Sequence, residues 1–239
     1  QLTAMFNYAV KYYDLHENPC TKAGSMGKSH AEEMNFWTKA EFEQFIVAVQ
    51  DKPASYTAFM TLYYTGMRVG ELCALTPADV DLVGHTITIN KTFQRINGRD
   101  VIWPPKTPKS NRVVTIPQTL ANCLKEYMDK CYEIQPDDRL FPYTKSFLNH
   151  EMLRGCKKSG VKKIRVHDLR HSHASLLIEM GCQPLLIADR LGHEKIQTTL
   201  NTYSHLYPNK QAEVAAQLEN VMNGTTVPNG SQMAGVANL

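Results

Sequence analysis

Two histidines, an arginine and a tyrosine lie close together late in the sequence, in a combination that suits phosphate chemistry. His167 and Arg170 are three residues apart, at the expected start of a helix. Residues at this spacing share one helix face, and the backbone N–H groups at a helix amino terminus attract phosphate. His193 follows in Leu-Gly-His, and Tyr203 stands ten residues after it. We interpret the stretch from His167 to Tyr203 as a phosphate site with its own nucleophile.

Arg68 and Lys106 are two further residues that would complete such a site. Arg68 lies in Thr-Gly-Met-Arg-Val-Gly-Glu-Leu, where Gly66 ends an apolar helical pattern and the arginine begins the next helix. Lys106 follows two prolines in a connection between two expected strands. A phenol with a pKa near ~10 is ionised only about one part in a thousand at neutral pH. Cationic neighbours and a proton acceptor must therefore activate Tyr203.

The histidines of this region raise the alternative of a zinc site. Four of them are candidates: His167, His171, His173 and His205. A zinc enzyme usually has a third ligand and a carboxylate base nearby, but the acids here, Asp168 and Glu179, do not follow the His-Glu-x-x-His pattern. We therefore expect neither a metal nor another cofactor, and we expect His171 and His173 to pack or to form hydrogen bonds.

Basic residues are unevenly distributed, although the net charge is only +3. One cluster lies between residues 91 and 112, where Asp100 is the only acid, and a second lies between residues 154 and 170. Charged runs are usually solvated faces, but these two lie next to the candidate site in the sequence and are candidates for contacts with a nucleic-acid backbone. The residues expected to contact DNA are Lys91, Arg95, Arg99, Lys109, Arg112, Lys162, Lys163 and Arg165.

Cysteine usage and hydropathy limit the class of protein. Six cysteines are scattered without a Cys-x-x-Cys pair, which favours free thiols in a reducing compartment over a zinc knuckle or a disulfide framework. No apolar run approaches the ~20 residues needed to cross a bilayer, and the start lacks the pattern of a secretory signal. We expect a cytoplasmic protein that has no membrane partner.

Sequence patterns divide the chain into four segments. Residues 1–19 are expected to contain a single helix, residues 20–35 a linker without periodicity, and residues 224–239 a disordered tail rich in small polar residues. Residues 36–223 are expected to form the main domain, which ends in a helix over residues 209–222.

The predicted fold class is α+β and mainly helical. A capping box, Thr38 with Glu41, begins the first helix of the main domain. Further helices are expected over residues 53–64, 118–133, 146–157, 168–180 and 184–191. Between residues 85 and 117 the period changes to two, which predicts a small antiparallel sheet with Asn97-Gly98 as a hairpin turn. Its three strands are expected over residues 85–91, 101–103 and 112–116.

In order and spacing, these residues resemble the tyrosine recombinases, the phage and transposon integrase group that also includes Xer and Cre. The resemblance covers about residues 36–219. It rests on the motif around Arg68, on Lys106, on His-Asp-Leu-Arg-His at 167–171, on Leu-Gly-His at 191–193 and on Thr-Leu-Asn-Thr-Tyr-Ser-His at 199–205. Only the last helix of that family's core-binding domain is matched, by residues 2–15, as expected of a catalytic fragment.

The resemblance implies a role for each residue of the site. Tyr203 would attack a DNA phosphodiester to give a 3′-phosphotyrosyl enzyme and a free 5′-hydroxyl, and Arg68 and Arg170 would neutralise the transition state. Lys106 would be the general acid, and His167 would accept the proton of Tyr203. His193 would hydrogen-bond the scissile phosphate. Glu71 would orient Arg68 or its neighbours.

The same resemblance implies the partners, which are double-stranded DNA and further copies of the chain. A dimer or tetramer on DNA is expected to form through the C-terminal helix. The ending around Tyr203 is most similar to integrases of Gram-positive phages and conjugative transposons. The alternatives are a dimer-resolving recombinase of the Xer kind, a type IB topoisomerase and a DNA-binding module without catalysis.

Overall fold

The computed structural model describes residues 2–24, 34–105 and 107–207, together with residues 215, 218, 219 and 222. The chain divides into two compact units, residues 1–35 and residues 36–239, which are described separately. The helix predicted over residues 209–222 lies outside the described residues apart from four isolated positions, and the predicted tail lies entirely outside them.

Two short helices make up the described part of the first unit. Helix α1 spans Leu2–Tyr12 and helix α2 spans Pro19–Ala23. Asn18 caps α2, and its side-chain amide donates to the carbonyl of Thr3 at 3.0 Å and to the side chain of Asn7 at 2.6 Å. A helix therefore occupies the start of the segment that was expected to be an irregular linker. The reason is local, since Asn18 supplies the cap and the following proline has its φ already fixed for a first helical position.

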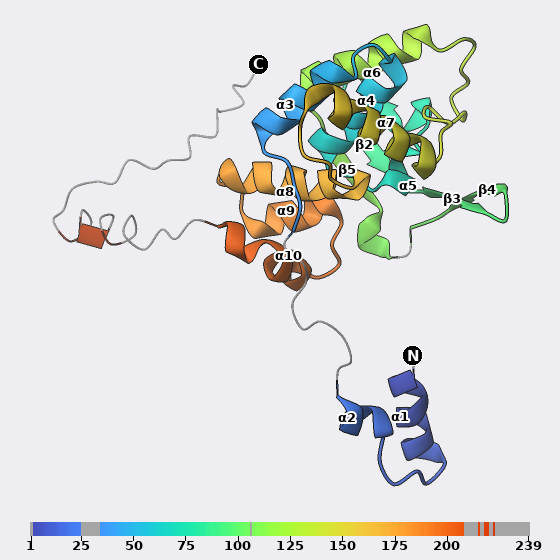
Figure 1. The fold of residues 1–239 in the computed structure, drawn as a ribbon, viewed down its shortest axis with the longest axis vertical. Helices are drawn as coiled ribbons and strands as arrows, with labels where there is room; N and C mark the ends of the chain where they lie inside the picture. Colours follow the sequence, from blue (N-terminus) through green and yellow to red (C-terminus); the bar gives the residue numbers. More distant parts are fainter. Residues whose placement is uncertain are drawn as a thin grey trace, which may run out of the picture. The chain divides into compact units, whose positions relative to one another are not determined.

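Helices build the core of the second unit around a central helix, α4 (Figure 1). The core helices are α3 (Lys39–Ala48), α4 (Pro53–Thr65), α6 (Gln118–Lys130), α7 (Lys145–Ser159) and α8 (Leu169–Glu179). Most residues of α4 are buried, because α3, α6 and α8 all pack against it. The predicted capping box at Thr38 is confirmed, since Thr38 accepts the N–H of Glu41 and the Glu41 carboxylate accepts the N–H of Thr38.

Three further helices lie where the candidate site residues are found. They are α5 (Val69–Leu72), α9 (Pro184–Leu191) and α10 (Ile196–Tyr203). Helix α9 packs against α8, α10 and the last strand. Short 3-10 helices connect the elements: η1 (Pro77–Asp79), η2 (Pro108–Ser110), η3 (Val166–Asp168) and η4 (Ser204–Leu206). Among the described residues, no helix is long and apolar enough to span a membrane.

The strands form two sheets instead of the single three-stranded sheet that the sequence predicted. Strands β1 (Val80–Asp81), β2 (Thr86–Ile89) and β5 (Arg112–Thr115) form one antiparallel sheet in the order β1-β2-β5. Strands β3 (Thr92–Ile96) and β4 (Arg99–Trp103) form a separate hairpin, which projects from the helical body in Figure 1. The predicted turn at Asn97-Gly98 is confirmed, with φ of 50° and 77°.

The division into two sheets has a simple cause. Ile87 and Ile89 of β2 face the core and pair with β5, whereas most residues of the β3–β4 hairpin are exposed. A pattern of period two identifies strands but does not show which strand is the neighbour of which. The strand expected over residues 85–91 therefore ends at Ile89, and β3 begins a new sheet at Thr92.

Candidate active site

A glycine turn between α4 and α5 places the first arginine of the site. Gly66 ends α4 in the left-handed region with φ 65°, and a Cβ at this position would lie 2.6 Å from a ring carbon of His173. Only glycine fits both the backbone conformation and the space. Arg68 follows as the residue before α5, and its side chain remains 39% exposed. The turn thus ends a buried helix and presents Arg68 to solvent.

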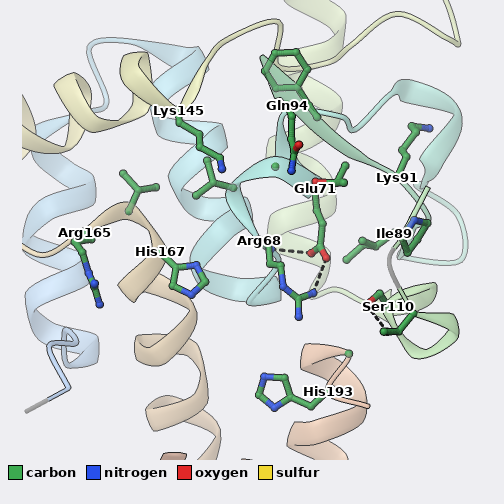
Figure 2. A pocket seen from close by; sticks show the side chains of 18 of the residues that line it. Arg68, Glu71, Ile89, Lys91, Gln94, Ser110, Lys145, Arg165, His167 and His193 are labelled. Carbon is green, nitrogen blue, oxygen red and sulfur yellow. Dashed lines mark hydrogen bonds and ion pairs between the residues drawn. The ribbon is translucent and has the colours of Figure 1, made fainter. Parts of the chain in front are cut away.

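Glu71 holds Arg68 and joins it to a second arginine, Arg112. The Glu71 carboxylate accepts the Arg68 backbone N–H at 2.7 Å and Arg68 Nη1 at 2.8 Å. It also accepts Nη2 of Arg112 at 2.9 Å, and the side chains of Glu71 and Arg112 are each only 6% exposed. Burial alone would raise the pKa of Glu71, but hydrogen bonds and charge from Arg112 and Arg68 hold it below the ordinary value. Glu71 is therefore ionised and fixes the direction of Arg68 (Figure 2).

Arg170 is the most deeply buried cation of the site. It is 4% exposed, and its guanidinium donates to the carbonyls of Gly66 and Leu191. Burial, together with the charges of Arg68 and Arg112, lowers the pKa of Arg170 to about 9, so the side chain is still cationic at neutral pH. In the described part of the chain, no carboxylate pairs with it. Its charge is therefore left for an anion.

The three arginines and the single glutamate leave a marked positive charge in one place. Three guanidinium groups against one carboxylate give a net charge of +2 for Arg68, Arg112, Arg170 and Glu71. The charge is preorganised, since Glu71 and backbone carbonyls fix the guanidinium directions before any ligand binds.

Two histidines lie beside these arginines, and His193 is neutral at pH 7. Removal from water, helped by the charge of Arg170, lowers the pKa of His167 and lowers that of His193 to about 4. His193 Nδ1 shares a hydrogen bond of 2.8 Å with the hydroxyl of Thr199. This bond fixes the ring orientation of His193, as second-layer hydrogen bonds do for other functional histidines.

Arg68, His167 and His193 face an open groove, which we call the basic groove (Figure 2). Its volume is about 860 Å³, and its walls come from α5, β3, α7, η3 and the segments around residues 105–110 and 192–198. Its charged or titratable lining residues are Arg68, Glu71, Lys91, Lys145, Arg165, His167, His193 and Glu194. Cations and histidines outnumber acids in this lining, which favours a polyanion as ligand.

Tyr203 does not line the basic groove in this structure. It is the last residue of α10, its side chain is only 1% exposed, and its hydroxyl lies 2.8 Å from His171 Nδ1. Burial raises the pKa of Tyr203 to about 12, against the opposing charge of Arg170. The resemblance drawn from the sequence implied His167 as the proton acceptor of Tyr203. The observed hydrogen-bond partner is His171, which lies on α8 four residues after His167.

The remaining histidines of this region form hydrogen bonds, as expected. His173 is buried and accepts from Arg190 Nε at 3.0 Å. Within the described ranges, no three His, Cys, Asp or Glu side chains are grouped so that they could hold a metal ion.

The expected general acid, Lys106, lies outside the described residues. Its sequence neighbours Pro105 and Thr107 both line the basic groove.

The residues expected to contact DNA fall into two groups. Lys91 and Arg165 line the groove, where they pair with Asp79 and Asp168. The others that are exposed lie on the β3–β4 hairpin, on η2 or just before η3: Arg95, Arg99, Lys109, Lys162 and Lys163.

Arg112 requires a correction, because its side chain is buried against Glu71 and is not a surface contact. Arg112 also donates through Nε to the carbonyl of Arg190 at 2.9 Å. It therefore links Glu71 to the end of α9. Lys145 and Gln94 are among the lining residues that the sequence did not point to. Lys145 follows the helix cap Thr144, and a cation at that position gives no signal in the sequence that separates it from an ordinary surface lysine.

This geometry describes a mainly helical domain with a cationic groove and a buried tyrosine close to it. A family model described as "Phage integrase family" matches residues 35–210. The chain belongs to the phage integrase family, and the resemblance drawn from the motifs is confirmed.

Relatives named as integrases match most of this chain. The ICEBs1 integrase of Bacillus subtilis (strain 168) is 33% identical over 235 residues, which cover 92% of this chain and 64% of that protein. The integrase of Staphylococcus phage L54a is 31% identical over 250 residues, which cover 90% of this chain and 71% of the relative. The chain therefore spans about two thirds of the length of these relatives.

Solved structures share the fold. The Tn1549 transposon integrase, solved with circular intermediate DNA, has a TM-score of 0.74 at 22% identity, with 92% of this chain and 76% of that chain covered. The catalytic domain of bacteriophage HP1 integrase has a TM-score of 0.56 at 22% identity, with 82% of this chain and 100% of that chain covered. The predicted mainly helical fold with small antiparallel strands is confirmed.

Proposed function

We propose that this chain cleaves and rejoins double-stranded DNA at specific sites, through a 3′-phosphotyrosyl intermediate, to integrate or excise a mobile element. The observation that carries the proposal is the net charge of +2 that Arg68, Arg112 and Arg170 retain around Glu71, beside the basic groove. A phosphodiester has one negative charge, and a second develops in the pentavalent transition state. The site is thus matched to the transition state more closely than to the ground state.

The arginines and histidines bind the scissile phosphate. Arg68 is exposed to the groove with its direction set by Glu71, and Arg170 supplies buried charge from the floor of the site. His193 donates to a phosphate oxygen through the ring nitrogen that Thr199 leaves free. A bound phosphate opposes the burial and the neighbouring cations that lower the pKa of His193, so it favours the protonated ring.

The chemical step transfers the phosphoryl group from one oxygen to another. The Tyr203 oxygen forms a bond to phosphorus while the bond from phosphorus to the 5′-oxygen breaks. His167 accepts the phenolic proton, and Lys106 supplies a proton to the departing 5′-oxygen. Rejoining is the reverse reaction on a new 5′-hydroxyl. Because the ester to Tyr203 conserves the energy of the broken bond, the proposal requires no nucleotide and no metal ion.

The relatives support the partners in this proposal. The similar proteins from ICEBs1 and phage L54a are named integrases, and the Tn1549 integrase was solved with circular intermediate DNA. We infer that the chain acts in the cytoplasm on double-stranded DNA, as a dimer or tetramer formed through residues 209–222. The exposed cations Arg95, Arg99, Lys109, Lys162 and Lys163 would contact the DNA backbone beside the site.

Covalent capture tests the proposal without knowledge of the target sequence. The chain is incubated with a pool of nicked duplexes of random sequence, and denaturant-resistant protein–DNA adducts are isolated and sequenced. We expect adducts at a restricted set of sequences, with DNA attached through its 3′ end. Tyr203→Phe should form none, and a chelator should not reduce the yield. DNA binding without any adduct, or an adduct in Tyr203→Phe, would refute the assignment of the nucleophile.

Supercoiled plasmids distinguish the proposal from a topoisomerase. A plasmid that carries two copies of a captured site should be recombined, whereas a plasmid without them should remain supercoiled. Efficient relaxation of both plasmids would identify a topoisomerase instead. Recombination limited to paired sites on one multimeric circle would favour a dimer-resolving enzyme.

A further inference from the structure

The hydrogen bond between Tyr203 and His171 joins the proposed nucleophile to a residue that the mechanism above does not use. The two groups are 2.8 Å apart, and their rings lie with centroids 5.7 Å apart. His171 lies on α8, four residues after His167 on η3, and the centroids of the two histidine rings are also 5.7 Å apart. His167 lines the basic groove, whereas neither His171 nor Tyr203 does.

This arrangement keeps the hydroxyl away from a phosphate in the groove. A nucleophile must come within about 3–3.5 Å of phosphorus, in line with the leaving oxygen. The Tyr203 hydroxyl is instead bonded to His171, whose ring centroid lies 5.7 Å from that of His167, the histidine that lines the groove. The side chain is only 1% exposed, so it has to leave its present surroundings before it can attack.

Building on the proposed function, we propose that His171 is a positioning residue that holds Tyr203 in a resting position outside the groove, and that cleavage requires this hydrogen bond to break. The proposal explains why a half-buried histidine meets a buried phenol here. A buried hydroxyl without a partner is unfavourable, so His171 is what makes the buried position of Tyr203 stable.

A second hydrogen bond between a histidine and a hydroxyl group also holds α10. Thr199 precedes Tyr203 by one turn, is fully buried and shares its hydroxyl bond with His193. Two histidines outside α10 thus bond two hydroxyls on one face of this helix. His193, the partner of Thr199, lines the basic groove. His171, the partner of Tyr203, does not. Release of Tyr203 alone therefore leaves α10 attached beside the site.

Two substitutions at His171 separate the hydrogen bond from the size of the side chain. His171→Phe keeps an aromatic ring but has no acceptor, so the phenol is left unsatisfied if it stays buried. His171→Asn places an amide near the position of Nδ1 and can preserve the bond. We expect His171→Phe to release Tyr203 from the resting position and His171→Asn to keep Tyr203 there.

Nitration with tetranitromethane measures the position of Tyr203 without DNA. Trypsin releases residues 196–210 as one peptide, in which fragment ions distinguish Tyr203 from Tyr207. Tyr132 is 89% exposed and serves as the reactive reference, whereas Tyr63 is 0% exposed and reports whether the fold is intact. We expect His171→Phe to raise nitration of Tyr203 relative to Tyr132 at least fivefold while Tyr63 stays protected, with His171→Asn close to wild type.

Adduct formation on the captured duplexes is the second measurement. His171→Phe should form the adduct about fivefold faster than wild type in a single turnover, because the resting state no longer competes. Unchanged nitration of Tyr203 in His171→Phe would overturn the proposal, and so would a slower adduct rate in that variant, since His171 would then assist the attack. If nitration rises but no variant forms an adduct, the resting position stands and the proposed function fails.

Discussion

Replacing Arg112 with methionine removes one half of a buried ion pair and leaves Glu71 behind. Both side chains are 6% exposed, and the remaining partner of Glu71, Arg68, is itself 39% exposed. Removing one member of a buried pair typically costs about 3–5 kcal/mol, because the other charge stays buried without compensation. Arg112 also donates to the carbonyl of Arg190, and loss of that hydrogen bond adds about 1 kcal/mol. We expect the free energy of unfolding to fall by about 4–6 kcal/mol at pH 7.

The sign of the pH dependence follows from the lowered pKa of Glu71. A carboxyl group with a lowered pKa contributes stability above its unfolded value of ~4.3, and that contribution is lost as the pH falls through the folded value. In the absence of Arg112, only Arg68 opposes the effect of burial on the pKa of Glu71, so this pKa rises. A protonated Glu71 needs no charged partner. The penalty of Arg112→Met should therefore be largest at pH 7 and shrink as the pH falls.

Urea unfolding at pH 7 and pH 5 measures both effects, with Arg112→Lys as the matched control. Lysine preserves the charge beside Glu71 but cannot also reach the Arg190 carbonyl, so its penalty should be smaller and nearly independent of pH. An equal loss at both pH values in Arg112→Met would refute the reasoning. So would a loss below about 1 kcal/mol at pH 7, because Glu71 would then not depend on Arg112.

Three further outcomes are expected. Arg170→Lys removes the guanidinium group that donates to two backbone carbonyls, so adduct formation should fall about 100-fold. The DNA affinity, measured by fluorescence anisotropy at fixed salt, should change little. Thr199→Val removes the bond that orients His193, so adduct formation should fall about tenfold, and an unchanged rate would show that the ring is held by other contacts. Gly66→Ala should lower the free energy of unfolding by about 2 kcal/mol or more in thermal denaturation, whereas Gly98→Ala, also at positive φ but with open space around it, should cost about 1 kcal/mol.

The sequence predicted best those features that depend on local spacing. The helix start at Thr38 and the helix end at Gly66 follow from capping and turn chemistry, and both lie where they were expected. Arg68, His167 and His193 were recognised from motifs, and the structure brings all three to one groove. Each of these motifs is short because a turn or a helix end fixes the side chain within a few residues.

Features that depend on distant partners could not be predicted in the same way. Arg112 looked like a member of a surface cluster because its partner, Glu71, stands 41 residues earlier in the chain. For Tyr203, helical periodicity places His167 and His171 on one face, but it does not show at which turn α10 meets that face. Charge runs and periodicity describe a segment, whereas burial and pairing describe the contact between two segments.

The close contact at Gly192 sets a limit on how this site can change in evolution. A Cβ at Gly192 would lie 3.0 Å from both Arg112 Cδ and the carbonyl oxygen of Lys109, in a residue with φ 66°. The segments that carry Glu71, Arg112 and His193 are thus fitted to one another, and we expect them to change together in evolution. Positions 71, 112 and 192 should covary among integrases, and chimeras that exchange only one of these segments between distant relatives should fold poorly.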